Sequence, residues 1–161
     1  MLSHMVTGQI TEQELVAAYS LHRRKTVFFI KLIAGIAFII GIAILVISPS
    51  RTGALFVFGA LGGLLGEFIQ DRLFLRPKLR RLYAQARGRV DLTYAWDDQK
   101  LFLSSAHGQA ARPWSDFLKA RESGELILLY FNDEAFEIVA KRWFADAGDL
   151  GSFRSHLTFV S

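Results

Sequence analysis

The sequence contains no cysteine, and its four histidines lie far apart. Without cysteine the chain forms no disulfide and no thiolate metal site, and it has no thiol nucleophile. The histidines show no metal-ligand spacing, and the sequence has neither a G-x-S-x-G nucleophile motif nor a Gly-Lys-Ser/Thr phosphate loop. We therefore predict a non-enzymatic protein without catalytic, cofactor-binding or metal-binding residues.

Acidic residues are scarce in the first half of the chain, whereas in the second half they outnumber the basic residues. Residues 1–87 carry 11 Lys/Arg against 4 Asp/Glu, a net charge of +7, whereas residues 89–161 carry 8 against 11, a net charge of −3. A basic protein can bind nucleic acid, but here the positive charge accompanies the long apolar runs. Membrane topology explains it more simply, so we expect no nucleic-acid partner.

The first long apolar run, Val27–Ile47, is interrupted by a single charge, Lys31. At about 1.5 Å per residue, a helix of this length crosses a hydrocarbon core of about 30 Å. Basic residues precede the run, as they do in a signal peptide. The run is, however, longer than the roughly 7 to 15 residues of such a peptide, and no small-x-small cleavage site follows. We predict a membrane helix.

A second apolar run, Ala54–Gly66, follows the polar loop Ser48–Thr52 and continues among charged residues to Leu75. Basic residues flank the pair of runs on both outer sides, while Arg51 is the one basic residue between them. By the positive-inside rule both flanks are cytoplasmic. The sequence thus predicts a two-pass protein of the bacterial inner membrane with both termini in the cytoplasm.

Two of the charged residues and four of the glycines in the predicted hairpin support further predictions. Counted along each helix from the outer loop, Lys31 and Glu67 lie at similar depths in the membrane. We therefore predict that they form an intramembrane ion pair rather than a proton relay. The G-x-x-x-G spacings of Gly59, Gly62, Gly63 and Gly66 predict close helix packing. We favour packing against the first helix over packing against another subunit, which leaves a homo-oligomer possible.

A basic stretch follows the second run and supplies Arg72, Arg76, Lys78, Arg80 and Arg81. Such stretches bind the anionic membrane surface, although fixing topology is the simpler role here. Pro77 should kink a helix in this stretch. Before the first run, Thr11 and Glu14 form a capping-box pattern that predicts a short amphipathic helix over Thr11–Tyr19.

From Arg89 the apolar period changes to two, which is typical of strands. Residues 90–97 alternate, and further strands are expected at 100–105, 109–113, 114–122, 125–131 and 135–139, separated by turn residues. The strand at 125–131 is apolar on both faces, so it is either central or a contact surface. Residues 146–157 have helical spacing. These patterns predict a small antiparallel sheet closed by a C-terminal helix.

Several short motifs in this region resemble the YcxB-like family. They are Trp114-Ser115-Asp116-Phe117, the apolar strand Leu126–Phe131, Phe136-x-Ile138, and Lys141-Arg142-x-Phe144 before a final helix. The family also has an amphipathic N-terminal segment and two membrane helices before this domain. The resemblance implies a fold like the pleckstrin-homology (PH) domain and implies little chemistry.

We therefore expect an α+β membrane protein, a two-helix transmembrane hairpin followed by a small antiparallel β domain. Its predicted parts are the N-terminal segment 1–25, the hairpin 26–75, the basic linker 76–88 and the β domain 89–161. Trp114, Lys141 and Arg142 are candidates for a protein-contact or lipid-headgroup site. The favoured function is a membrane-anchored protein-interaction module whose partners are the lipid bilayer and another protein. An immunity protein that neutralises a membrane-active toxin is the alternative.

Overall fold

The computed structural model describes residues 4–47, 51–85 and 90–160. The chain divides into two compact units, one formed by Met1–Leu21 with Leu82–Ser161 and the other by His22–Arg81. The predicted boundaries kept residues 1–25 apart from the β domain. The structure instead joins the first 21 residues to the C-terminal region, so the helical unit is inserted into the β unit. The loop 48–50 and the boundary at residue 88 lie outside the described residues.

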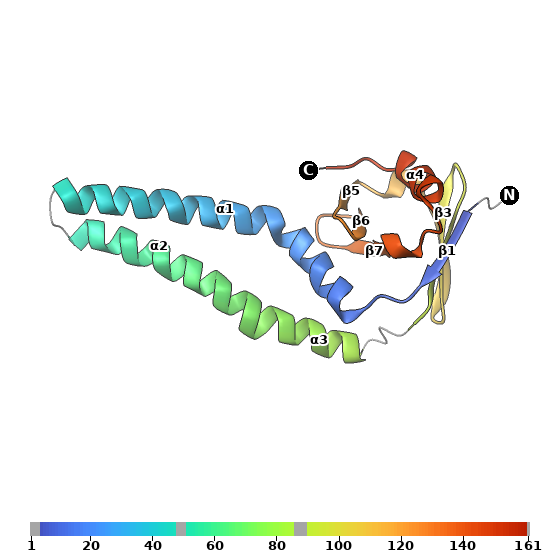
Figure 1. Ribbon diagram of the computed structural model, residues 1–161, viewed down its shortest axis with the longest axis horizontal. Coiled ribbons are helices and arrows are strands. Elements are labelled where there is room, and N and C mark those ends of the chain that lie inside the picture. The colour runs from blue at the N-terminus through green and yellow to red at the C-terminus, as the bar shows by residue number, and fades with distance from the viewer. Residues whose placement is uncertain (1–3, 48–50, 86–89, 161) are drawn as a thin grey trace. The chain divides into compact units, whose positions relative to one another are not determined.

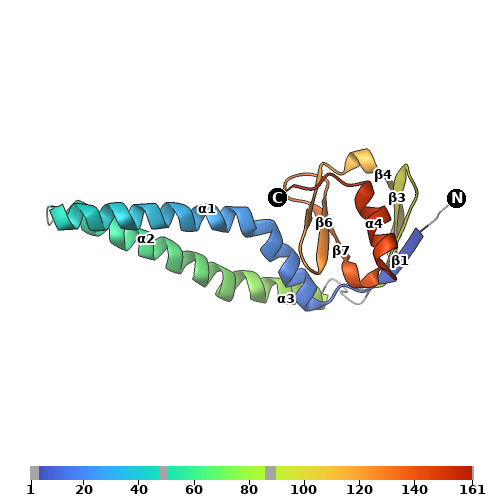
Figure 2. The ribbon, with the colours of Figure 1, turned by 45° about the horizontal axis from the view of Figure 1, so that its top comes forward.

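The helical unit is a hairpin of two long helices. Helix α1 spans Glu12–Ile47, and helix α2 spans Arg51–Ile69. The two lie side by side in both ribbon views (Figures 1 and 2). The short helix predicted over Thr11–Tyr19 is the first part of α1. Its capping box is confirmed, because the Thr11 N–H donates to Glu14 Oε2 at 2.8 Å and the Glu14 N–H donates to Thr11 Oγ1 at 3.2 Å.

After α2 the helix widens into the π-helical segment η1 (Gln70–Leu75) before α3 (Arg76–Gln85) continues. The Arg76 N–H donates to the Asp71 carbonyl, a bond across five residues instead of four. Pro77 explains the change of pitch, because proline has no N–H and its ring crowds the carbonyl four residues earlier. The predicted disturbance at Pro77 thus takes the form of a π-helical segment just upstream of it.

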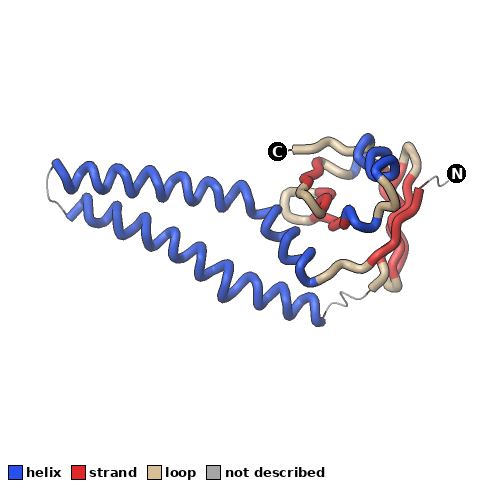
Figure 3. Tube along the Cα trace, in the orientation of Figure 1, coloured by secondary structure: helices blue, strands red, loops and turns tan. Residues whose placement is uncertain are grey.

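Within the described residues, seven strands form two antiparallel sheets rather than the single sheet predicted. The four-stranded sheet has the order β1-β2-β3-β4, and the three-stranded sheet has the order β5-β6-β7. Figure 3 shows the strands in red. Their bounds are β1 His4–Gly8, β2 Leu92–Trp96, β3 Lys100–Ser105, β4 Gly108–Pro113, β5 Lys119–Glu122, β6 Leu126–Tyr130 and β7 Phe136–Ala140.

Strand β1 was not expected from the sequence, yet it pairs with β2 along its whole length, from His4 opposite Trp96 to Gly8 opposite Leu92. The two strands are separated in sequence by the entire helical hairpin. A side chain at Gly8 would collide with Trp143, since its Cβ would lie 2.0 Å from the indole Nε1. Glycine is therefore needed where β1 meets the 3₁₀ turn η3 (Lys141–Trp143).

The turns between strands agree largely with the expected positions. The Asp97 carboxylate accepts from the Gln99 and Lys100 N–H groups, and the Asn132 side chain accepts from Glu134 and Ala135. The segment predicted as one strand over 114–122 is divided. It begins with the 3₁₀ turn η2 (Trp114–Asp116) and becomes β5 only at Lys119.

The core of the β unit lies between the sheets and is closed by α4 (Ala147–Ser155). Every residue of β6 is buried, so this doubly apolar strand is the central strand of its sheet. The predicted C-terminal helix is confirmed, and Asp146 caps it by accepting from the Asp149 N–H. Phe153 of α4 packs its ring against Trp96 and Phe144 (α4 is seen in Figure 2).

Candidate functional site

Glu67 pairs with a different residue from the one predicted. Arg23 Nη2 lies 3.0 Å from Glu67 Oε1 and 3.2 Å from Oε2, whereas Lys31 is exposed. The prediction counted residues from the outer loop and so assumed that both helices rise equally. Arg23 lies eight residues before Lys31 on α1, and its long, planar side chain suits a carboxylate better. The predicted Lys31–Glu67 pair is therefore replaced by Arg23–Glu67.

The predicted glycine packing within the hairpin is also corrected. A Cβ added at Gly59, Gly62, Gly63 or Gly66 would meet nothing within 4 Å, so these glycines do not contact α1. Close approach occurs nearer the loop. A Cβ at Gly41 would lie 2.9 Å from the Phe56 Cβ, and one at Gly53 would lie 2.8 Å from Leu45 Cγ. The helices converge where Gly41 and Gly53 remove side-chain bulk.

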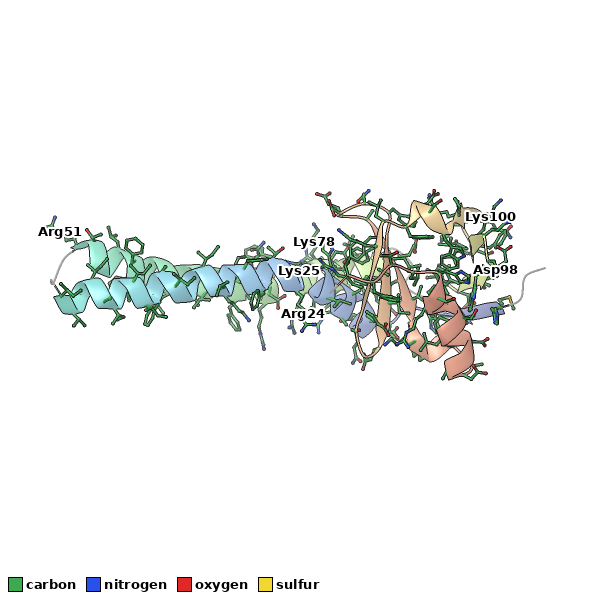
Figure 4. The ribbon with its side chains drawn as sticks, turned by 90° about the horizontal axis from the view of Figure 1, so that it is seen from above. Arg24, Lys25, Arg51, Lys78, Asp98 and Lys100 are labelled. Carbon is green, nitrogen blue, oxygen red and sulfur yellow. The ribbon has the colours of Figure 1, made fainter. Side chains whose placement is uncertain are left out.

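The predicted basic residues remain exposed, on η1 and α3. Within the helical unit, Arg24, Lys25 and Lys78 lie at one end of the hairpin and Arg51 at the other (Figure 4). Arg76 is engaged locally, since its Nε donates to Asp71 Oδ2 at 3.0 Å. Contact with an anionic lipid surface stays a prediction for Arg72, Arg76, Lys78, Arg80 and Arg81.

Trp114 packs within the β unit. Its indole N–H donates to the Asp97 carbonyl at 2.9 Å, and its ring stacks on His156 with centroids 4.7 Å apart. It also meets the Phe153 ring edge-on, at 5.6 Å. These contacts tie η2 to β2 and α4. Trp114 is thus a packing residue rather than the centre of a surface site.

Lys141 and Arg142 are both occupied by internal partners, which argues against the predicted headgroup site. Lys141 forms an ion pair with Glu122 and donates to the Ser123 carbonyl. Arg142 Nε donates to Glu14 Oε1 at 2.7 Å, and its Nη2 donates to Glu14 Oε2 at 3.0 Å and to the Gln9 carbonyl at 2.6 Å. Arg142 therefore fastens the first turn of α1 to the β unit.

Buried Glu14 completes this junction. Burial by itself raises the pKa of the carboxyl, but hydrogen bonds from Arg142 and Thr11 outweigh it and leave the pKa below its ordinary value. The same pairing raises the pKa of Arg142. The next turns of α1 continue the attachment, because Ala18 is fully buried in the core and the Tyr19 ring meets Phe136 at 5.5 Å.

A cavity of about 280 Å³ opens within the β unit. Tyr94, Leu103 and Ala110 are register partners across β2, β3 and β4, so they form one row on its wall. This row faces the other sheet, because the Tyr94 hydroxyl donates to Glu137 Oε2 of β7 at 3.2 Å. Arg112, Ser105 and His107 also line the cavity.

Glu137 places a partly buried carboxyl group in the lining of this cavity. Burial raises the pKa of its carboxyl, while Tyr94 and Arg112 act in the opposite direction. Burial and the nearby Glu137 charge also raise the pKa of Tyr94. Among the described residues, Glu137 has the Tyr94 hydroxyl as its hydrogen-bonding partner and no ion pair within 4 Å. Among the described residues, we take this partly desolvated acid, in a cavity lined by both apolar and polar side chains, as the candidate site.

Sequence reasoning did not find this site. The one sequence signal for this site was an acid at the second position of the otherwise apolar strand Phe136–Ala140, opposite the core residue Leu129. The other wall comes from β2, β3 and β4, which the turns at 97–99 and 106–107 bring together. The described residues contain no group of three or more His, Cys, Asp or Glu placed to hold a metal ion.

These features define an α+β chain in which two helices, long and apolar enough to cross a membrane, interrupt a small antiparallel β unit. Residues 96–157 match the model of the YcxB-like protein family, so this region is similar to a YcxB-like domain. The match runs from the end of β2 through α4 and confirms the resemblance seen in the sequence. No curated protein and no solved structure matches the chain.

Proposed function

We propose that the protein is a membrane-anchored interaction module, in which the α1–α2 hairpin crosses the bilayer twice and holds the YcxB-like domain at its surface. The pairing of β1 with β2 carries this proposal. These strands belong to one sheet but lie on either side of the hairpin in sequence. They must occupy the same compartment, so the intervening chain crosses the membrane an even number of times.

The surface of the helical unit supports membrane insertion. Large apolar side chains point outward along both helices, and Ile39, Leu55 and Phe58 are each about 70% exposed. Soluble monomers rarely expose a continuous apolar surface of this extent. Cleavage of α1 as a signal peptide would also remove β1 and the buried Ala18, both of which belong to the β unit. Retained membrane helices account for these observations together.

The distribution of charge favours the cytoplasmic side of a bacterial inner membrane for the domain. Arg24, Lys25 and Lys78 gather at the end of the hairpin away from Arg51 (Figure 4). Such an excess of positive charge is typical of the cytoplasmic side. The arrangement of four strands, three strands and a C-terminal helix is compatible with a PH-like fold, which we include in the proposal.

Protein recognition is the favoured role of the domain. Its basic residues Lys141 and Arg142 are held by Glu122 and Glu14, which leaves them poorly placed to bind a lipid headgroup. The net charge of −3 over residues 89–161 also opposes adsorption to an anionic leaflet. Nothing in the fold of the described residues or in the family match favours the immunity-protein alternative.

Two experiments test this proposal. Reporter fusions at Arg51 and at the C-terminus should report opposite sides of the membrane, with the C-terminus in the cytoplasm. A cytoplasmic signal at Arg51 would contradict the two-pass hairpin. Photo-crosslinking residues placed singly over the exposed surface of the domain in living cells should then yield discrete protein adducts. Adducts with lipid alone would exclude the interaction role.

A further inference from the structure

We propose that the exposed edge of β4 and the adjoining cavity bind an extended segment of a partner protein, which inserts one Arg or Lys side chain against Glu137. The inference rests on the proposed interaction function and specifies the chemistry of the partner. It joins two independent observations, an uncovered strand edge and an accessible, partly desolvated carboxyl group.

Strand β4 is more exposed than the other edge strands of the domain, β1, β5 and β7. Strand β4 is terminal in the four-stranded sheet, and all six of its residues are exposed. By contrast, β1 is in close contact with Trp143 at Gly8. The outer edge of β5 is occupied by the C-terminal segment, since the Ala120 N–H donates to the Thr158 carbonyl and the Val160 N–H donates to the Ala120 carbonyl.

An exposed strand edge presents unpaired N–H and C=O groups that can pair with an added strand. In β4, Pro113 cannot donate a hydrogen bond, and Arg112 is a charged residue whose guanidinium lies 4.7 Å from the Phe131 ring centroid. Both features restrict pairing at this end. Residues Gly108–Ala111, all small except Gln109, form the remaining accessible edge, which is long enough for a few residues of a partner.

The cavity lies on the inner side of this accessible edge. Gly108 and Ala110 line it and contribute little bulk, which leaves space for a side chain from an added strand. Apolar walls at Leu92, Leu103 and Ala110 suit the aliphatic part of Arg or Lys. Beyond them, the Glu137 carboxylate accepts one hydrogen bond from Tyr94 and retains capacity for further donors.

The negative charge of Glu137 indicates that the inserted side chain is basic. Among the described residues Glu137 has no ion pair within 4 Å; Arg112, whose guanidinium lies over the Phe131 ring, acts on it only through a longer-range charge interaction. Burial disfavours the ionised form of the Glu137 carboxyl. A guanidinium or ammonium group that enters the cavity would stabilise that ionised form by charge attraction. An acidic side chain would instead place two carboxyl groups together. We therefore assign a basic, extended segment as the ligand.

The test uses the full chain in detergent or nanodiscs and a short fluorescein-labelled peptide of alternating Thr and Val with one central Arg. Matched peptides carry Gln or Glu at that position. Two variants alter the site, Glu137→Gln by removing the charge and Ala110→Leu by filling the cavity. Glu134→Gln is the control, because it makes the same charge change in the exposed turn before β7.

We expect the Arg peptide to bind the unaltered chain, and Glu137→Gln to weaken its binding about tenfold, the effect of losing one charge-assisted contact. Ala110→Leu should also weaken binding, Glu134→Gln should leave it unchanged, and the Glu peptide should bind least. Equal binding to the Glu137→Gln and Glu134→Gln proteins would overturn the proposal. So would a failure of the Arg peptide to bind the unaltered chain.

A crosslinking comparison separates this inference from the proposed function. Photo-crosslinkers at Gln109 on β4 and at Glu125 before β6 probe two different exposed positions. Crosslinks to a protein at Glu125 but not at Gln109, without peptide binding, would overturn the β4 site and leave the interaction function in place. Crosslinks at Gln109 that disappear in the Glu137→Gln protein would support both.

Discussion

At the scale of single residues, Glu137 is the side chain that fits its surroundings least well. It occupies a position in β7 whose cross-strand neighbour, Leu129, is fully buried, and it faces Tyr94 across the gap between the sheets. An acid in such a place costs stability unless it is paired. Its presence there is consistent with a binding role, because functional sites often retain locally unfavourable groups.

Replacing Glu137 with Gln should therefore stabilise the protein at neutral pH, by an amount of the order of 1 kcal/mol. Because the folded-state pKa of Glu137 is raised, the folded protein holds this proton more tightly than the unfolded chain. The carboxyl thus supports folding in acid, and this support is lost as the pH rises through the folded-state pKa. Thermal unfolding of both proteins across pH measures the difference.

The stability gained by Glu137→Gln should disappear below the ordinary Glu pKa of 4.5, because there the unaltered Glu137 is protonated in both the folded and the unfolded state. Glu134→Gln, at an exposed turn position, should show no comparable gain. A Glu137→Gln protein that is less stable at neutral pH would show that the ionised carboxylate makes a net favourable contact, contrary to our assignment.

Arg142 and Glu14 give the opposite pH dependence. Replacing Arg142 with Ala leaves the buried Glu14 carboxylate without its main partner, which should cost about 2 kcal/mol at neutral pH. The folded-state pKa of Glu14 is lowered, so its contribution to stability is present above pH 4.5 and is lost as the pH falls through the folded-state pKa. Chemical unfolding at several pH values measures it.

A double variant tests the reason for this loss. Adding Glu14→Gln to Arg142→Ala should recover part of the stability, since a neutral Gln keeps the capping interaction with Thr11 and leaves no unpaired charge. If the two single losses simply add, Arg142 and Glu14 are not coupled in the folded protein.

At the scale of elements, the close glycine contacts of the hairpin lie near its loop, whereas Arg23 and Glu67 pair toward its other end. The tight contacts are at Gly41 and Gly53, while the sequence pattern at Gly59–Gly66 faces open space. A G-x-x-x-G spacing shows that a helix has a smooth face but does not say which neighbour meets that face. The prediction that these four glycines pack against α1 was therefore wrong, and packing of this face against another subunit stays a prediction.

Gly41→Ala should disturb the hairpin more than Gly62→Ala. The added methyl at position 41 would lie 2.9 Å from both Phe56 Cβ and the Val57 backbone N, so the helices must move apart, whereas the methyl at position 62 meets no atom within 4 Å. Disulfide crosslinking between cysteines introduced singly into α1 and α2 would report the separation. A larger effect at Gly62 would indicate that this face contacts a second copy of the chain.

At the scale of the whole molecule, the hairpin is an insertion between two neighbouring strands of one sheet. Helix α1 begins within the β unit, where Arg142 and the core around Ala18 hold it, and continues without a break into its apolar part. Residues Glu12–Leu21 of α1 therefore pack with the β unit, while the rest of the helix belongs to the helical unit.

This organisation predicts which fragments fold. Residues 89–161 alone lack β1 and the first turns of α1, so they should be poorly folded when expressed alone. Joining residues 1–21 to residues 82–161 through a flexible Gly/Ser linker should give a folded, soluble protein rich in β structure. Circular dichroism and thermal unfolding compare the two. A stable fold for residues 89–161 would show that β1 is dispensable.

Much of the local structure was determined by the sequence alone. Long apolar runs, the capping box at Thr11, the alternation in β2 and the turn residues at Asp97 and Asn132 act over a few residues, so they predicted elements close to those observed. The short motifs around Trp114 and Lys141 were enough to indicate the YcxB-like family, which the match over residues 96–157 confirms.

Only the tertiary structure decided which distant segments meet. Strand β1 is five residues long and its partner β2 follows the whole hairpin in sequence, so no local pattern could predict their pairing. The same holds for Arg23 with Glu67, for Arg142 with Glu14, and for the cavity where Glu137 faces β2, β3 and β4. Periodicity and turn chemistry specify the conformation of a segment, whereas partners across long sequence distances depend on how all the apolar faces are buried together.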